Sequence, residues 1–207
     1  MIDLYSSATP NGRKISIMLE ELKVKYNSIF INLEEKEQFS DDFSKISPAN
    51  KVPVIVDKDN NQTVFESGAI LLYLAKKYNR FLNEDNYWEI IQWVFFQMAY
   101  VGPMLGQAHQ YLFYNPGKSK FAEEKTKGYA KHIYEILDKR LSKQEFFSKE
   151  YSIADISIWP WTARFERHQI DLNNYPNVLR WYRQISERPA VIRGYNNVGN
   201  FFEIPKP

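Results

Sequence analysis

The alternation of apolar and polar positions changes character near residue 80. Before that point, short β-prone runs alternate with segments that have helical spacing. The predicted strands cover residues 2–6, 26–31, 52–57 and 63–65, and the predicted helices cover residues 11–22, 41–46 and 67–77. This order, β-α-β-α-β-β-α, combines a crossover unit with a terminal hairpin and predicts a small mixed sheet flanked by helices.

Strand signals stop after residue 80, and the rest of the chain has helical patterning. The predicted helices cover residues 87–112, 121–141, 153–167 and 175–186. Gly102 and Pro103 are expected to kink or break the first of them, because proline cannot donate a helical hydrogen bond. The change in pattern predicts a fold of class α/β plus all-α, with a mixed domain over residues 1–80 and an α-helical domain over residues 87–207.

Two shorter features stand out in the helical region. Ser152 followed by Asp155 fits a capping box at the start of a helix. Near the end of the sequence, Phe201 and Phe202 are expected either to cover a cleft or to pack on a partner.

Composition narrows the class of protein further. The 207 residues are 44% hydrophobic and 25% charged, which is typical of a globular protein, and the net charge of +2 does not favour nucleic acid as a partner. The chain has no Cys, which excludes disulfides and a thiol nucleophile of its own. No signal peptide or apolar run of about 20 residues is seen, so we expect a cytoplasmic protein without a membrane partner.

The stretch "TPNG", residues 9–12, joins a predicted strand to a predicted helix. Thr9 fits a helix N-cap and Pro10 the first helical position, so the stretch is also explained as a helix start alone. In the functional interpretation, the backbone N–H groups, the Thr9 hydroxyl and the Asn11 amide point at one bound sulfur. Such donors and the positive end of the helix dipole favour a thiolate over a thiol.

Two further motifs suggest recognition of a short peptide. In "KVPVIVD", a cis bond before Pro53 would turn the backbone of Val52 outward, where an extended peptide can pair with it; the alternative is an ordinary trans proline. In "FESGAI", Ser67 is either a simple helix cap or a donor to a carboxylate, with Glu66 holding an ammonium beside it. A free amino-acid head carries both groups.

Taken in order, these motifs resemble those of the cytosolic glutathione transferases. The fragments "TPNG", "ISPANKVP", "FESGAILLYLA", "GPMLGQ" and "YSIADISIWPW" are more narrowly similar to the bacterial nu-class subgroup, whose members include glutathione-dependent disulfide-bond oxidoreductases. The resemblance covers nearly the whole chain. It implies a thioredoxin-like N-terminal domain, an α-helical C-terminal domain and, usually, a homodimer.

The resemblance also implies a glutathione site. Its binding residues would be Gln38, Lys51, Val52, Pro53, Glu66 and Ser67. Val52 would pair by its backbone with the cysteinyl unit, and Glu66 and Ser67 would bind the γ-glutamyl end. Gln38 and Lys51 would approach the glycyl end.

Several side chains compete for the role of activating the sulfur. Tyr5, Ser6, Ser7 and Thr9 all carry hydroxyls near the turn, and Tyr5 is explained as well by an ordinary place in a strand. We expect Thr9 and Asn11 together to be the catalytic residues, acting as hydrogen-bond donors to a thiolate.

The absence of Cys bears on the reaction. An enzyme of this kind that reduces disulfides must borrow both thiols from two glutathione molecules. The alternatives are conjugation of glutathione to electrophiles, and a non-catalytic regulatory protein that binds glutathione.

Other candidates come from the helical region. Residues that either face the substrate or pack in the core are Met104, Gln107, Trp161 and Phe165. His109, His132 and His168 lack the spacing of metal ligands, so no metal is expected.

Overall fold

The computed structural model describes residues 1–197 and 203–207, and Phe201 and Phe202 therefore lie outside the described residues. The chain forms two compact units. The first consists of Met1–Leu82 with Glu187–Ile204, and the second of Asn83–Ser186 with Pro205–Pro207. The predicted mixed α/β arrangement followed by helices is confirmed.

The first unit is built on a four-stranded mixed sheet. Its strands are β1 (Ile2–Ser6), β2 (Tyr26–Phe30), β3 (Val54–Asp57) and β4 (Gln62–Phe65), in the order β2-β1-β3-β4. β1 pairs parallel with β2, and β3 pairs antiparallel with both β1 and β4. Leu4, at the centre of β1, lies opposite Ile55 of β3, and both side chains are completely buried. The sheet therefore supplies the core of this unit.

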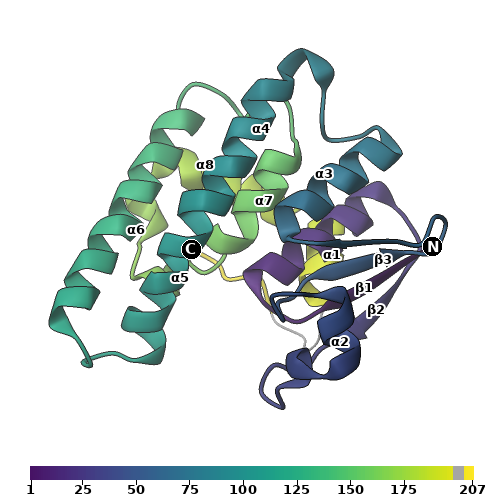
Figure 1. Ribbon diagram of the computed structural model, residues 1–207. Helices are drawn as coiled ribbons and strands as arrows, with labels where there is room; N and C mark the ends of the chain where they lie inside the picture. Colours follow the sequence, from purple (N-terminus) through teal and green to yellow (C-terminus); the bar gives the residue numbers. More distant parts are fainter. Residues whose placement is uncertain (198–202) are drawn as a thin grey trace. The chain divides into compact units, whose positions relative to one another are not determined.

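Helices cover both faces of this sheet (Figure 1). They are α1 (Pro10–Leu22), α2 (Asp41–Ile46), α3 (Ser67–Tyr78) and α9 (Pro189–Asn196), with a 3-10 turn at Glu37–Phe39. α1 and α3 lie on one face and α2 on the other. On the α2 side, the rings of Tyr5 and Phe43 are 6.4 Å apart, so Tyr5 has a packing role in the sheet.

Helix α9 was not predicted, and it belongs with the first unit instead of the helical region expected to extend to residue 207. It lies against α1 so closely that a Cβ on Gly194 would sit 2.5 Å from the Ile17 Cα. The Ser16 hydroxyl donates to the Gly194 carbonyl at 2.6 Å, and Arg188 forms a bidentate pair with Glu21 at 2.6 and 2.9 Å. These contacts join residues far apart in sequence, which local patterns do not reveal.

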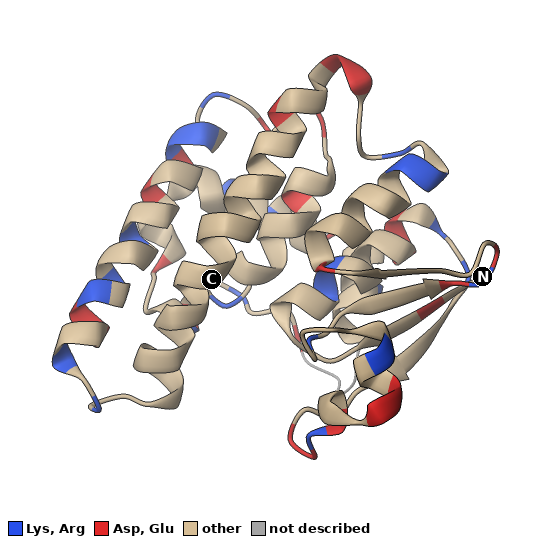
Figure 2. Ribbon diagram, in the orientation of Figure 1, with Lys and Arg blue, Asp and Glu red and all other residues tan. Residues whose placement is uncertain are grey.

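The second unit is helical. Its longer elements are α4 (Tyr87–Phe96), α5 (Gly102–Ala108), α6 (Lys120–Leu141), α7 (Ile153–Thr162) and α8 (Pro176–Ser186). Short 3-10 turns lie at Glu84–Asn86, Phe165–His168 and Leu172–Asn174. Charged residues of both signs follow one another along α6 (Figure 2). Within the described part of the chain, every helix is too short or too polar to cross a membrane.

Two predicted helices of this unit differ from the structure. The one over 87–112 is divided by π-helical turns at Gln97–Val101 and His109–Tyr114. The first π turn directly precedes Gly102 and Pro103, as expected where a proline removes a hydrogen-bond donor from the helix. The one over 153–167 ends earlier: Thr162 is the last α-helical residue, and the chain tightens into the 3-10 turn Phe165–His168.

The predicted capping box at the start of α7 is present. The Ser152 hydroxyl accepts from the Ala154 N–H at 3.2 Å, and the Asp155 carboxylate accepts from the Ser152 N–H at 3.0 Å. Asp155 is completely buried and also accepts from the Phe147 N–H at 3.1 Å and the Trp181 indole N–H at 2.8 Å. The Ser152 and Asp155 side chains at this helix start are therefore hydrogen-bonded to other groups of the protein.

Candidate functional site

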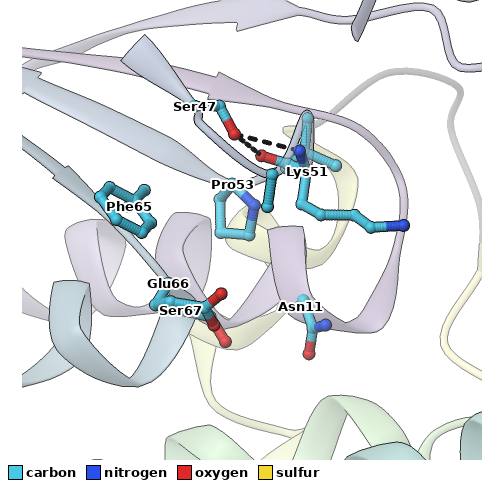
Figure 3. A pocket seen from close by; sticks show the side chains of 9 residues that line it. Asn11, Ser47, Lys51, Pro53, Phe65, Glu66 and Ser67 are labelled. Carbon is cyan, nitrogen blue, oxygen red and sulfur yellow. Dashed lines mark hydrogen bonds between the residues drawn. The ribbon is translucent and has the colours of Figure 1, made fainter. Parts of the chain in front are cut away.

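A polar pocket in the first unit brings the sequence motifs together (Figure 3). Its lining residues are Asn11, Ser47, Ala49, Lys51, Val52, Pro53, Phe65, Glu66 and Ser67. Glu66, Ser67 and Asn11 lie on one side of it, at the starts of α3 and α1, and Lys51 and Pro53 lie on the other. Of the eight predicted site residues, six line this pocket.

The start of α1 is held by a tight turn. Thr9 is the N-cap, and its hydroxyl oxygen accepts from the Gly12 N–H at 3.0 Å. Gly12 has no room for a side chain, because a Cβ there would lie 2.3 Å from the Ser7 carbonyl oxygen. The turn thus places the half-buried Asn11 at the pocket.

The loop before β3 forms the opposite wall. The Val52–Pro53 peptide bond is cis. Just before it, the Ser47 hydroxyl donates to the Lys51 carbonyl at 2.9 Å and accepts from the Lys51 N–H at 3.0 Å. This two-way contact from a buried serine holds the backbone that leads into Val52.

Glu66 and Ser67 occupy the turn from β4 into α3. Glu66 precedes the helix with φ of 68°, a region in which residues other than glycine are uncommon. Such a conformation costs about 1–3 kcal/mol and is typical of functional sites. Within the described residues, the Glu66 side chain makes no capping hydrogen bond, and it lines the pocket. Ser67 is the first helical residue, not the N-cap, and is 5% exposed.

A residue that the motifs did not indicate lies behind Ser67. Lys14 of α1 is 1% exposed, and its ammonium nitrogen donates to the Ser67 hydroxyl oxygen at 3.2 Å. Burial holds the pKa of Lys14 well below its usual value, and the nearby Glu66 carboxylate raises it. The signal available in the sequence was a lysine three positions after Asn11, on the same face of the helix.

Two described residues of the predicted site, Thr9 and Gln38, lie outside the lining of the pocket. Thr9 acts as the helix cap, and Gln38 lies in the 3-10 turn Glu37–Phe39. Ser6 and Ser7 are buried, and the Ser6 hydroxyl donates to the Ser7 carbonyl at 3.4 Å. The catalytic role of Thr9 and the binding role of Gln38 stay predictions.

Two of the four substrate-side candidates in the helical unit are buried, and Met104 is partly buried. Trp161 is 8% and Phe165 is 6% exposed, as the packing alternative expects, whereas Gln107 is exposed. His109 and His168 are stacked with ring centroids 4.7 Å apart. Among residues 1–197 and 203–207, no group of three or more His, Asp or Glu is arranged to hold a metal ion.

The chain belongs to the glutathione S-transferase family. The N-terminal-domain model of that family matches residues 2–76, and the C-terminal-domain model matches residues 122–184. The fold is therefore a thioredoxin-like N-terminal domain followed by the family's helical domain.

Among its relatives, the chain is 43% identical to the disulfide-bond oxidoreductase YfcG of Escherichia coli, covering 92% of this chain and 93% of the relative. It is 37% identical to the disulfide-bond oxidoreductase YghU of the same organism, covering 93% and 73%. A glutathione transferase of Pseudomonas putida, solved with one glutathione disulfide bound per subunit, superposes with a TM-score of 0.90 at 36% identity, covering 96% of this chain and 92% of that one.

Proposed function

We propose that this protein is a glutathione-dependent disulfide-bond reductase. The observation that carries the proposal is the pocket, which gathers Asn11, Lys51, Val52, Glu66 and Ser67 in a chain without cysteine. The two relatives named as disulfide-bond oxidoreductases support the reaction class. The solved relatives that hold glutathione or its disulfide support the ligand.

The pocket matches the functional groups of glutathione. Glu66 offers a carboxylate for the ammonium of the γ-glutamyl end, and Ser67 at the start of α3 offers donors for its carboxylate. Lys51, which is exposed at the rim, suits the glycyl carboxylate, and the backbone at Val52 suits the cysteinyl unit. Asn11 is assigned to the sulfur, with Thr9 beside it in the same turn.

The reaction balances without a thiol from the protein. The thiolate of one glutathione attacks the substrate disulfide, forms a mixed disulfide and releases one substrate thiolate. A second glutathione thiolate attacks the glutathione sulfur of that mixed disulfide, which yields glutathione disulfide and the second substrate thiolate. The protein binds the reactants and lowers the thiol pKa; a decrease of two units needs about 2.7 kcal/mol of differential stabilisation.

We assign the protein to the nu-class subgroup, as a cytoplasmic homodimer. The subgroup rests on the motifs and on the relative at 43% identity. An exposed apolar stripe on α4 supports a partner surface: Trp88 is 78% and Phe95 is 60% exposed, and they lie seven residues apart on one helix face. The cytoplasm supplies the reduced glutathione that the reaction consumes.

The test is a pair of steady-state assays on the wild-type protein. The first follows reduction of 2-hydroxyethyl disulfide with glutathione, glutathione reductase and NADPH, and the second follows conjugation of chlorodinitrobenzene. We expect strong disulfide turnover and weak conjugation. The reverse would make the protein a conjugating transferase, and silence in both assays with glutathione still bound would favour the regulatory alternative.

A further inference from the structure

Another cavity lies within the helical unit, where α6 meets the segment that joins α7 to α8. Lys127 and Lys131 of α6 line it, and its other lining residues fall between His168 and Tyr175. The volume of this α6 cavity is about 430 Å³, within the range of about 300–1,000 Å³ that is typical of small-molecule sites. It shares no lining residue with the pocket in the first unit. An occupant would therefore be a ligand that the proposed reaction does not use.

The charges around the α6 cavity favour an anion. Lys127 and Lys131 are exposed and four residues apart, so they are neighbours on one helix face. Lys127 forms no ion pair with a described residue, and the exposed Glu135 carboxylate lies 3.9 Å from the Lys131 ammonium nitrogen. The Asp171 carboxylate also lines the cavity, but it already accepts from the Asn173 N–H at 2.9 Å and from its side-chain amide at 2.8 Å.

The remaining wall offers an aromatic ring and two amides. Tyr175 is half-buried, and its ring centroid lies 5.6 Å from that of the buried Tyr134. An aromatic side chain in such a wall is a surface on which a planar base can stack. Gln169 and Asn174 are exposed lining residues whose side-chain amides both donate and accept. Neither amide is hydrogen-bonded to another described residue, so both are available to the polar edge of a base.

His168 adds a buried polar atom to this wall. It is 1% exposed, and its Nδ1 lies 3.0 Å from the Tyr134 hydroxyl oxygen. Its Nε2 has no hydrogen-bond partner among the described residues, which is uncommon for a buried polar atom. Burial holds the pKa of His168 well below its usual value, so the ring is neutral near pH 7. A ligand hydroxyl group that reaches this wall would suit either tautomer, because a hydroxyl both donates and accepts.

We propose that the α6 cavity binds a ribonucleoside monophosphate. Lys127 and Lys131 receive the phosphate, Tyr175 receives the base, and the ribose hydroxyls lie towards His168. A phosphate monoester carries a charge of about −1.5 to −2 near pH 7, which matches two lysines better than the single charge of a carboxylate does. The proposal goes beyond the proposed function and does not depend on it.

The first measurement is calorimetry of the protein with the four ribonucleoside 5′-monophosphates. We expect at least one of them to bind. Its nucleoside, which lacks the phosphate, and inorganic phosphate, which lacks the base, should each bind at least tenfold more weakly. Because the two sites share no lining residue, a saturating concentration of glutathione should leave the affinity for the nucleotide unchanged.

The second measurement repeats the titrations with lysine variants. Lys127→Met combined with Lys131→Met removes both charges and keeps the length of the side chains. We expect it to weaken the nucleotide at least tenfold and to change the affinity for the nucleoside less than twofold. Lys125→Met is the matched control, because Lys125 is an exposed residue of the same helix outside the lining of the cavity. It should bind the nucleotide as the wild type does.

Failure of all four nucleotides to bind would overturn the proposal. Equal affinity for inorganic phosphate would also overturn it, since the site would then recognise only a small anion. Displacement of the nucleotide by glutathione would place the nucleotide in the pocket of the first unit instead. An unchanged affinity in the doubly substituted protein would show that the nucleotide binds away from the two lysines.

Discussion

Helices α3 and α7 both begin beside a serine and an acid, yet the two helix starts are completed in opposite ways. At α7, the Asp155 carboxylate accepts hydrogen bonds from the backbone, a hydroxyl and an indole, and is completely buried. At α3, Glu66 keeps an exposed side chain at a pocket, and its backbone adopts an uncommon conformation. The first arrangement stabilises the protein, and the second leaves the same chemistry available to a ligand.

The largest effect should come from removing the buried Asp155 carboxylate at the start of α7, and it should be on the free energy of unfolding. Asp155→Ala leaves the Phe147 N–H and the Trp181 indole N–H without their acceptor, and each buried unsatisfied donor costs about 1–3 kcal/mol. We expect the free energy of unfolding in urea to fall by about 3–5 kcal/mol. The affinity of the folded variant for glutathione should be unchanged.

Asp171→Ala is the matched control, because Asp171 also caps a helical turn but is exposed. It should cost about 1 kcal/mol or less. Equal decreases in the free energy of unfolding of the two variants would show that burial of the Asp155 carboxylate does not add to the stability of the protein.

The next effect is on the pH dependence of stability. Burial, with smaller contributions from Arg167 and Arg164, lowers the pKa of His109 to about 3. Below its unfolded pKa of about 6.5, this imidazole binds fewer protons in the folded protein than in the unfolded chain, so the free energy of unfolding falls as pH falls. Its share of the loss between about pH 6.5 and 5 is about 2 kcal/mol.

Two other buried groups, His168 and Asp155, modify the total change. Burial also lowers the pKa of His168, which adds to the loss, whereas burial raises the pKa of Asp155 to about 6, which opposes it below that pH. Urea unfolding of the wild type and His109→Gln is compared at both pH values, and the difference reports His109 together with its effect on the stacked His168. The variant should lose about 2 kcal/mol less on acidification. The exposed His132 offers the control His132→Gln, which should follow the wild type.

At the start of α3, the effect of a substitution should be on the binding of glutathione. Ser67→Ala removes the donor assigned to the γ-glutamyl carboxylate, so we expect glutathione to bind at least tenfold more weakly by calorimetry, which is about 1.4 kcal/mol. The free energy of unfolding should change less than in Asp155→Ala. Ser142→Ala, at an exposed helix end, is the control. Unchanged affinity would show that Ser67 is not a binding residue. The start of α3 would then not differ from the start of α7 by serving a ligand.

The smallest effect should come from the start of α1. Asn11→Ala removes one of the donors assigned to the glutathione thiolate, and a hydrogen bond worth about 1 kcal/mol corresponds to a rise of about 0.7 in the thiol pKa. The thiolate absorbance of bound glutathione, measured against pH, checks this. Asn27→Ala, at an exposed position of β2, should reproduce the wild-type curve. A wild-type curve for Asn11→Ala would leave Asn11 as part of the helix start alone.

The features that sequence predicted well are those specified by neighbouring residues. The strands, the turn at residues 9–12 and the capping box all depend on short stretches, and the pocket gathers the motifs around Val52 and Glu66. Lys14 was not predicted as a site residue because its partner Ser67 is 53 residues away in the sequence. Helix α9 was not predicted because its contacts are also distant in sequence: Arg13 donates to the Tyr195 carbonyl across 182 residues.

The first unit combines segments that are far apart in the sequence, and this sets the order in which its parts can come together during synthesis. Helix α1 is synthesised before α9, which packs against it and follows more than a hundred residues later. At roughly 5–20 residues per second, the 166 residues between Leu22 and Pro189 take about 8–33 s to synthesise, and the α9-facing side of α1 stays uncovered for that time. During that interval the buried ring of Tyr195, over which the Arg13 guanidinium lies at 3.6 Å in the finished protein, has not yet been made. The helix that carries Asn11 and Lys14 is therefore completed only by a segment synthesised more than a hundred residues after it.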